Sequence, residues 1–158
     1  MIRVAILTVS DSCAQGKRED ISGQTIKDIL TKNGFEICDK RIVEDNREAI
    51  ANGLKYFSDK ADIDVVITTG GTGLGPRDTT PEATDSVCER TVPGLSEIIR
   101  AQGWKKTRSA VLSRGVAGIR NKTLIINLPG SPKAVKESLE IILDLLPHAV
   151  DMMLGCGH

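Results

Sequence analysis

The chain alternates between short, continuous apolar runs and segments whose apolar residues recur at helical spacing. Continuous runs of Val, Ile and Leu are typical of strands that are buried on both faces of a sheet. The predicted strands are residues 2–9, 35–43, 64–69 and 122–128. Apolar residues three or four positions apart lie on one face of a helix, so the segments between these runs predict amphipathic helices.

Capping residues and prolines mark where the helices should begin and end. The predicted helices begin near Ser22, at Asn46, within residues 79–82, near Leu95 and at Ser131. For the third helix, Thr79 with Glu82 fits a capping box. Thr80 followed by Pro81 fits an alternative start, with proline at the first helical position. Pro147 is expected to end the last long helix and to be followed by a short helical tail.

Strands that alternate with helices predict one parallel sheet covered by helices on both faces. Residues 110–112 and 115–119 are too short and ambiguous to be assigned to either type. The chain has 158 residues and no internal repeat, low-complexity tract or linker. Residues 1–158 are therefore expected to form a single α/β domain.

Composition argues against several classes of function. Lys and Arg together number 21, as do Asp and Glu, and this neutral balance argues against a dedicated nucleic-acid-binding protein. The few aromatic residues are too scattered for a platform on which bases stack: Phe35, Tyr56, Phe57 and Trp104. The core must therefore be built mainly from aliphatic side chains.

The sequence contains no recognisable zinc-binding, membrane-spanning or targeting segment. The cysteines form no C-x-x-C pair, and both histidines, His148 and His158, lie near the end of the chain. Isolated cysteines are typical of reduced thiols in a cytosolic protein. No apolar run approaches the roughly 20 residues that cross a bilayer, and the N-terminal run becomes polar too soon for a signal peptide. We expect a soluble, cytoplasmic protein that binds neither membranes nor nucleic acid.

Polar residues gather where the predicted strands end. In an open parallel sheet, ligands bind at the carboxyl ends of the strands, beside the point where the strand order reverses. Because parallel strands all point the same way, the polar segments that follow them should converge on one edge. These segments are residues 8–12, 44–46, 68–78 and 127–133.

A glycine-rich loop follows the third predicted strand. Residues 70–75, the glycine loop, contain four glycines, whose backbone amides can turn toward an anion and form a phosphate-binding nest. The loop lacks the Gly-Lys-Ser/Thr of a P-loop, and Pro76 stands where a dinucleotide-binding fingerprint needs its last glycine. A tight turn without a ligand is the alternative, but the flanking Thr, Arg and Asp residues favour an anion site.

Asp45 and Asp78 follow two of the converging strands and are candidate ligands for Mg²⁺. Proteins commonly hold Mg²⁺ with one or two carboxylates together with substrate phosphates and water. The alternative roles of both aspartates are to cap a helix or to solvate a loop. Arg77 is either a solvated charge or the partner of an anion.

A second candidate anion site lies at the start of the last long helix. Unpaired backbone amides and the helix dipole favour negative charge near Ser131 and Pro132, and Lys133 adds a positive charge. A well-capped helix start without a ligand is the alternative. Two anion sites on one rim indicate two phosphorylated ligands or one bulky one. They favour nucleotide-dependent transfer onto an anionic small molecule.

Taken together, the motifs resemble the molybdopterin adenylyltransferase family of molybdenum cofactor biosynthesis. They cover nearly the whole chain in order: SDS at 10–12, DISG at 20–23, VED at 43–45, TTGGTG at 68–73, RDTTPE at 77–82, LSR at 112–114 and LPGSP at 128–132. The chain is similar to free-standing members rather than to domains within larger proteins. The resemblance implies a three-layer α/β/α molybdopterin-binding fold with a mostly parallel sheet, and a homotrimer.

The resemblance also implies a reaction and its ligands. Molybdopterin and Mg-ATP would give adenylylated molybdopterin and pyrophosphate, which prepares the cofactor for metal insertion and for hand-over to a molybdenum-insertion protein. ATP would be a co-substrate and Mg²⁺ a cofactor. The attacking group would be the terminal phosphate of the pterin, so catalysis would rest on alignment and charge neutralisation rather than on a covalent nucleophile.

The residue roles of the family carry over by position. Asp45 and Asp78 match the two essential aspartates and would hold Mg²⁺ through the phosphates of the nucleotide. Nucleotide contacts would fall on Ser10, Asp11, Ser12, Gly70, Gly71, Thr72 and Gly73. Contacts with the pterin or its phosphate would fall on Ser113, Asn127, Pro129, Gly130, Ser131 and Lys133.

Two other interpretations compete with the enzyme. A trimeric protein of the same fold could bind molybdopterin without transferring AMP, and the presence of both Asp45 and Asp78 favours the enzyme over this role. An unrelated α/β nucleotide-binding protein would bind ATP but ignore the pterin. Release of pyrophosphate from Mg-ATP and molybdopterin distinguishes the first alternative, and direct pterin binding distinguishes the second.

Overall fold

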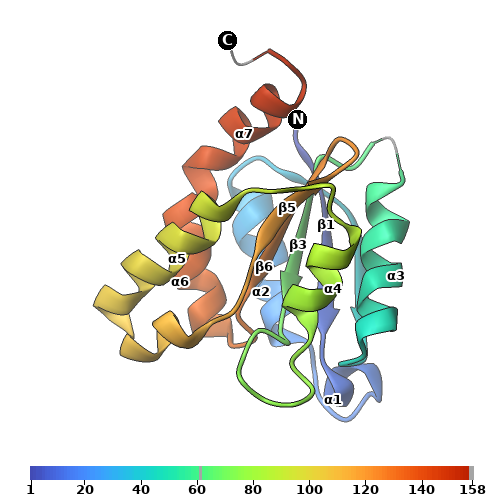
Figure 1. Ribbon diagram of the computed structural model, residues 1–158, viewed down its shortest axis with the longest axis vertical. Coiled ribbons are helices and arrows are strands. Elements are labelled where there is room, and N and C mark those ends of the chain that lie inside the picture. Colours follow the sequence, from blue (N-terminus) through green and yellow to red (C-terminus); the bar gives the residue numbers. More distant parts are fainter. Residues whose placement is uncertain (61, 157–158) are drawn as a thin grey trace.

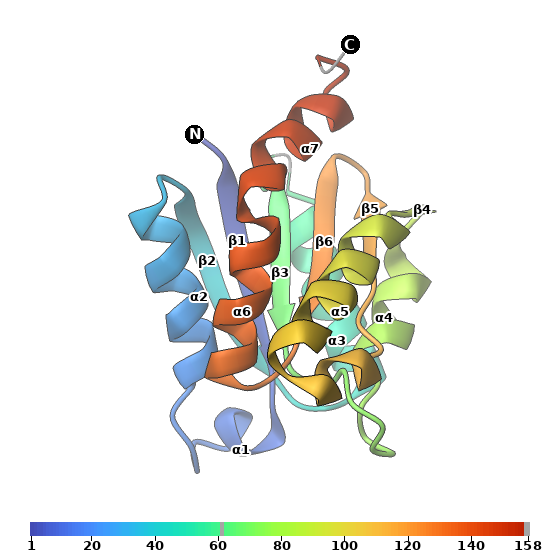
Figure 2. The same cartoon turned by 90° about the vertical axis from the view of Figure 1, so that its left-hand side faces the viewer.

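The computed structural model describes residues 1–60 and 62–156, so His158 lies outside the described residues. Within these residues, six strands form one sheet with helices on both faces (Figures 1 and 2). No helix in this part of the chain is both long and apolar enough to cross a bilayer. The elements in chain order are β1 (Arg3–Val9), α1 (Asp11–Ala14), α2 (Ile21–Lys32), β2 (Glu36–Val43), α3 (Arg47–Ser58), β3 (Val65–Thr69), α4 (Thr80–Val87), β4 (Arg90–Thr91), α5 (Pro93–Lys106), the 3-10 helix η1 (Arg108–Leu112), β5 (Ala117–Arg120), β6 (Thr123–Leu128), α6 (Pro132–Ile142), the 3-10 helix η2 (Leu143–Leu145) and α7 (Leu146–Met153).

The sheet has the strand order β2-β1-β3-β6-β5-β4. β1 pairs in parallel with β2 and β3, and β3 pairs in parallel with β6. The order reverses between β1 and β3, since the chain first adds β2 on one side of β1 and then β3 on the other. Thr8, Thr69 and Leu128 are in register at the carboxyl ends of β1, β3 and β6. The predicted α/β/α fold with a mostly parallel sheet is therefore confirmed.

The edge formed by β5 and β4 is antiparallel and was not predicted. β5 overlaps the segment 115–119, which was too short for its secondary structure to be predicted, and extends one residue beyond it to Arg120. A tight turn at Asn121, whose φ is 54°, folds β5 back onto β6. Asparagine tolerates this left-handed conformation better than most residues. The mostly parallel sheet therefore carries an antiparallel edge that the sequence did not reveal, because short strands are stabilised by their partners rather than by their own periodicity.

The alternation of side chains along the strands divides the core into two layers. In β1, Val4 and Ile6 face the layer under α2, α5 and α6, while Ala5 and Leu7 face the layer under α3 and α4. Figure 2 shows the first group of helices in front of the sheet and the second behind it. Among the described residues, Phe35 and Phe57 are the only aromatic side chains of the core, so the prediction of a mainly aliphatic core is confirmed.

Two predicted helix caps form and two do not. The side chain of Asn46 accepts the amide of Ala49 (2.9 Å) at the start of α3, and the predicted start at Ser131 likewise forms. At α4, the Thr79 hydroxyl is buried without a partner, so the capping box is absent. Thr80 is the first helical residue and its hydroxyl donates to the carbonyl of Gly70 (2.9 Å) instead. A tertiary contact thus replaced the cap predicted at Thr80, whereas the Thr79 hydroxyl has no partner among the described residues.

Pro147 begins a helix instead of ending one. α6 ends at Ile142, a 3-10 turn follows, and Pro147 lies in the first turn of α7. Proline is tolerated there because the first-turn amides have no partner within the helix. The predicted end of the last long helix was therefore wrong, although the short helical tail beyond it is present.

The chain turns sharply where β3 ends, and this turn places the glycine loop. Gly70 has a φ of 100°, and its amide donates to the carbonyl of Leu128 (3.2 Å). A Cβ atom at Gly70 would overlap the carbonyl oxygen of Val9 at the end of β1. Glycine is therefore required both by its backbone conformation and by the close approach of β1.

Replacing Gly70 with Ala should lower the free energy of unfolding by about 2–3 kcal/mol, because the substitution adds strain and a steric overlap. Equilibrium urea unfolding measures this change. Gly94→Ala is the matched control, since a Cβ there would meet no atom within 4 Å and the φ is not left-handed. The control should change stability by less than about 1 kcal/mol. Equal unfolding midpoints for the two variants would contradict the role assigned to Gly70.

Candidate active site

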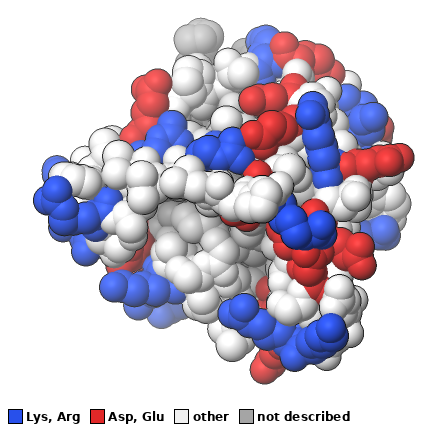
Figure 3. Space-filling view, turned by 60° about the horizontal axis from the view of Figure 1, so that its bottom comes forward, with Lys and Arg blue, Asp and Glu red and all other residues white. Residues whose placement is uncertain are grey.

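A two-lobed cleft opens at the carboxyl ends of the parallel strands. The helix lobe, about 600 Å³, lies between α5, η1 and α6. The strand lobe, about 380 Å³, lies between the ends of β1 and β3 and the start of α2. Figure 3 shows this end of the molecule, with a hollow of mostly uncharged atoms and Lys and Arg side chains at its rim. The two lobes share four lining residues: Gly71, Asp78, Gly130 and Ser131.

The residues predicted to contact a nucleotide divide between the lobes. Those that line the strand lobe are Ser10, Gly70 and Gly71. Thr72 and Gly73 line the helix lobe instead. Asp11 and Ser12 line neither lobe. They follow Ser10 at the start of α1, where the Ser12 hydroxyl lies 3.2 Å from that of Ser10.

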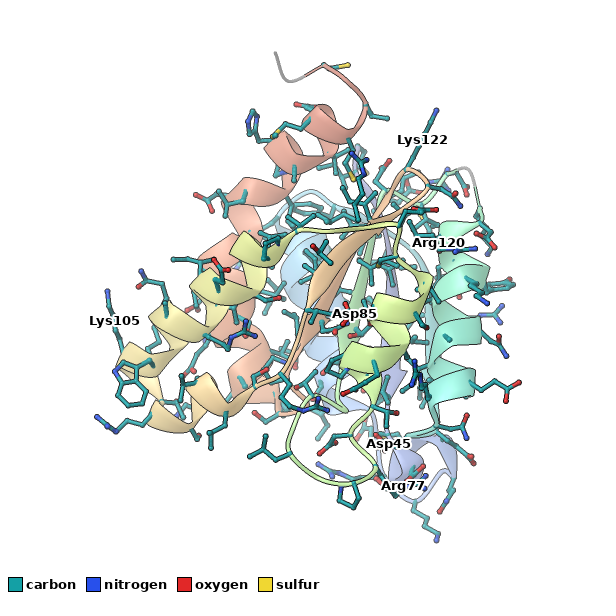
Figure 4. The ribbon with its side chains drawn as sticks, viewed as in Figure 1. Asp45, Arg77, Asp85, Lys105, Arg120 and Lys122 are labelled. Atoms are coloured by element: carbon teal, nitrogen blue, oxygen red, sulfur yellow. The ribbon has the colours of Figure 1, made fainter. Side chains whose placement is uncertain are left out.

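Asp45 lines the strand lobe and is bound to Asp11 by two reciprocal hydrogen bonds. The amide of Asp11 donates to Oδ2 of Asp45 (3.0 Å), and the amide of Asp45 donates to Oδ1 of Asp11 (3.0 Å). Arg77 donates from Nε and Nη2 to the Asp11 carboxylate, at 2.8 and 3.0 Å. Figure 4 shows Asp45 and Arg77 at this end of the sheet, with Lys122 at the opposite end. Arg77, predicted as a solvated charge or an anion partner, is thus ion-paired within the protein.

The charges around Asp45 suit a cation. Burial raises the pKa of Asp45 above its ordinary value, and the nearby charges of Asp11 and Asp78 act in the same direction. The hydrogen bonds from Arg77, by contrast, lower the pKa of Asp11. Within the described residues, no three His, Cys, Asp or Glu side chains are grouped to hold a metal by themselves. Asp45 and Asp78 both line the strand lobe, so a divalent cation held by these two carboxylates would take its remaining ligands from phosphate and water.

Asp78 organises the glycine loop from its far end. Its Oδ2 atom accepts the amide of Gly75 (2.9 Å), and a Cβ at either Gly73 or Gly75 would lie 2.9 Å from the same oxygen. These two glycines make room for the Asp78 carboxylate, which is a requirement of packing alone. The sequence pattern showed the glycines but not this reason for them.

Arg114 ties the middle of the glycine loop to Asp78 beyond it, and it was missed as a functional residue. Its guanidinium donates to the carbonyl of Gly73 (2.9 Å) and to the carbonyl of Asp78 (2.7 Å), while it pairs with the Glu82 carboxylate. Its own amide donates to the carbonyl of Thr72 (2.9 Å). The pairing with Arg114 lowers the pKa of Glu82, so the pair stays ionised. Only its place in the LSR motif, beside Ser113, signalled this role in the sequence.

Most of the residues predicted to bind the pterin or its phosphate meet in the helix lobe. They are Ser113, Pro129, Gly130, Ser131 and Lys133. The start of α6 lies there, and the Ser131 hydroxyl accepts the amide of Ala134 (3.1 Å). The remaining amides at this helix end favour an anion, and Lys133 adds a positive charge nearby.

Asn127 lines neither lobe. It is only 3% exposed, and its side-chain amide donates to the hydroxyls of Thr68 (3.1 Å) and Thr84 (2.9 Å). Its Oδ1 atom accepts the amide of Val116 (3.1 Å). These bonds use the whole amide group to join β6, β3 and α4, so Asn127 supports the site from inside the core.

The strand lobe contains two further polar residues, from the DISG motif, that were not predicted as site residues. Asp20 accepts the hydroxyl of Thr8 (2.7 Å) and caps α2 through the amide of Gly23 (2.9 Å). Ser22 donates to the carbonyl of Gly130 (2.6 Å). Together they fasten the start of α2 to β1 and to the loop before α6, and so they shape the wall of the strand lobe.

Comparison with known proteins shows similarity to molybdopterin-related proteins along nearly the whole chain. The family model described as "Probable molybdopterin binding domain" matches residues 5–148. A molybdopterin adenylyltransferase of Helicobacter pylori is 44% identical over 157 residues, which are 98% of this chain and 89% of that protein. Molybdenum cofactor biosynthesis protein B of Escherichia coli is 40% identical over 142 residues, 89% of this chain and 82% of that protein.

A solved structure agrees with this sequence similarity. The crystal structure of the molybdopterin biosynthesis enzyme MoaB of Thermus thermophilus has a TM-score of 0.92 and 48% identity, and the match covers 98% of both chains. The family suggested by the motifs is confirmed by both the sequence and the fold. The chain belongs to the molybdopterin-binding domain family of molybdenum cofactor biosynthesis proteins.

Proposed function

We propose that this chain is a molybdopterin adenylyltransferase, which transfers AMP from ATP to the terminal phosphate of molybdopterin and releases pyrophosphate. The observation that carries the proposal is the two-lobed cleft, whose lobes meet at Gly71, Asp78, Gly130 and Ser131. Two lobes that adjoin at these residues suit two substrates whose phosphates must react with each other. The relative from Helicobacter pylori, which bears the name of this activity, supports the same conclusion.

Molybdopterin is assigned to the helix lobe and the nucleotide to the strand lobe. In the helix lobe, the start of α6 with Lys133 and the hydroxyl of Ser113 would receive the pterin phosphate. In the strand lobe, Ser10 and the amides at the start of the glycine loop would contact the triphosphate. The two phosphate groups would then meet where the lobes adjoin, beside the residues that line both.

The reaction needs alignment more than it needs a protein nucleophile. An oxygen of the pterin phosphate forms a bond with the α-phosphorus of ATP, and the bond from that phosphorus to the oxygen bridging to the β-phosphate breaks. The pyrophosphate that leaves keeps the bonding electrons. Residues of both lobes would hold the two groups in line, and the amides of residues 70–73 would stabilise the charge that develops on the transferred group.

Asp45 and Asp78 are the residues that would hold Mg²⁺. Bound there with phosphate oxygens, the ion supplies neutralisation of the triphosphate charge. Both carboxylates line the strand lobe, and the raised pKa of Asp45 reflects burial and its anionic neighbours. Arg114 would keep Asp78 in place by holding its carbonyl group.

The proposal extends to assembly and to the path of the product. Family membership supports a homotrimer, a cytoplasmic location and hand-over of adenylylated molybdopterin to a molybdenum-insertion protein. The alternative is a trimeric protein that binds molybdopterin but does not transfer AMP. A test of turnover would distinguish this alternative from the enzyme.

Asp78→Asn should lower kcat for pyrophosphate release by about 100-fold or more, because it removes a charge from the metal-nucleotide site. Asparagine keeps an oxygen that can accept the amide of Gly75, so the loop should stay in place. Molybdopterin binding should stay largely intact. Coupled pyrophosphate detection and equilibrium binding of molybdopterin measure the two effects separately.

Asp85→Asn is the matched control for this experiment. Asp85 is exposed on α4, away from both lobes, and Figure 4 shows its position. This control should keep the wild-type rate. If Asp78→Asn also kept that rate, its assignment to the metal site would be wrong, and if the wild type released no pyrophosphate, the non-catalytic alternative would be correct.

The activity should also depend on pH through Asp45. The raised pKa moves the acid limb of the kcat/KM profile to higher pH than an unperturbed Asp would give, because Asp45 must be ionised to work. The charge of Arg77 lowers the pKa of Asp45, so Arg77→Gln should move the acid limb to higher pH. Lys122→Gln, which removes a positive charge at the other end of the sheet, should leave the limb in place. An unchanged or downward-shifted limb in Arg77→Gln would count against the role of Asp45.

A further inference from the structure

The helix lobe extends well beyond the predicted phosphate site, along α6. Its charged lining residues are Asp78, Lys133 and Glu137, and Asp78 lies where the two lobes meet. Glu137 is therefore the carboxylate that belongs to the helix lobe alone. The neighbouring wall is formed by apolar side chains of α5, η1 and α6: Ile99, Ala110, Leu112 and Ile141. Such a wall suits the faces of a flat ring system.

The Glu137 carboxylate is shielded from solvent but has no close partner of its own. Its side chain is 18% exposed. The hydroxyl of Thr107 lies 3.5 Å from Oε2, and the Lys133 ammonium lies 4.0 Å from Oε1 on a side chain that is 79% exposed. Both distances are at the outer limit for their type of interaction. A carboxylate in this setting gains from a ligand that donates hydrogen bonds to it.

The pterin and the adenine of ATP differ in the hydrogen-bonding groups that they could present to the Glu137 carboxylate. The pyrimidine edge of a pterin presents a ring N–H beside an amino group, and these two donors match the two oxygens of a carboxylate. Adenine presents an amino group beside a ring nitrogen that accepts, which repels the second carboxylate oxygen. Glu137 therefore favours the pterin over the adenine of ATP.

The order of groups along α6 matches the order of groups in molybdopterin. Ser131 and the free amides lie at the N-terminal end of the helix, and Glu137 lies six residues further on, about 9 Å along the axis at the α-helical rise. In molybdopterin, the fused rings separate the phosphate from the amino edge of the pyrimidine. We propose that Glu137 is a specificity-determining residue that binds the pyrimidine edge of the pterin, while the start of α6 binds the phosphate. This inference rests on the proposed function.

Glu137→Gln tests this assignment. The substitution replaces one acceptor oxygen with a donor that faces the donors of the pterin. The dissociation constant of molybdopterin should rise by about 10- to 100-fold, which is the range for a lost hydrogen bond to a charged group. The dissociation constant of Mg-ATP should stay unchanged. Both constants are measured by equilibrium binding to the full chain, with molybdopterin prepared anaerobically.

Two further variants make the test specific. Glu140→Gln makes the same chemical change one turn along α6, where Glu140 pairs with Lys106 (3.1 Å) outside the helix lobe. It should bind molybdopterin as the wild type does. Glu137→Asp keeps the charge but retracts it, and it should weaken molybdopterin binding less than Glu137→Gln does.

Each outcome separates this inference from the proposed reaction. Equal molybdopterin affinity in Glu137→Gln and Glu140→Gln would overturn the role of Glu137 while leaving adenylyl transfer intact. Weakened Mg-ATP binding with normal molybdopterin binding would also overturn it, since the nucleotide base would then occupy the helix lobe. A wild type that binds molybdopterin through Glu137 but releases no pyrophosphate would support this inference and reject the adenylyltransferase activity.

Discussion

The close approach of four chain segments at Gly70 is the constraint on which the site depends. Its amide donates to the end of β6, its carbonyl accepts the hydroxyl of Thr80 at the start of α4, and its α-carbon borders Val9 at the end of β1. A Cβ at Gly130 would lie 3.3 Å from the α-carbon of Gly70, which brings in the loop before α6. Because these segments meet without side chains between them, the two lobes of the cleft can share one thin wall.

The charges around that wall are organised before any ligand binds. Asp11, Asp45 and Asp78 gather on one edge, where Arg77 compensates Asp11 while burial and the other carboxylates raise the pKa of Asp45. Arg114 compensates Glu82 and holds the carbonyl of Asp78. The neutral net charge of the chain thus conceals a local excess of carboxylate in the strand lobe. That excess is what a cation and a triphosphate would use together.

Several features of the fold could be predicted from the sequence, and the exceptions have a common cause. The buried strands and the start of α3 at Asn46 follow from local periodicity and capping, which act over a few residues. β4 and β5 were missed because they are short and depend on pairing for stability, β5 with β6 and β4 with β5. The caps predicted at Thr79 and Thr80 do not form, because the hydroxyl of Thr80 bonds to Gly70 and Glu82 pairs with Arg114. In each case a contact with a distant segment outweighed a local preference.

The sequence by itself determined the parallel strands, the aliphatic core and the family, because hydrophobic period and motif order are properties of neighbouring residues. It also indicated that Asp45 and Asp78 belong to one edge of the sheet, and both line the strand lobe. The tertiary structure decided which residues meet: Asn127 is buried as a support, Arg77 pairs with Asp11, and Glu137 enters the helix lobe. These outcomes depend on the packing of elements that are far apart in the chain, and no local pattern encodes the distance between two such side chains.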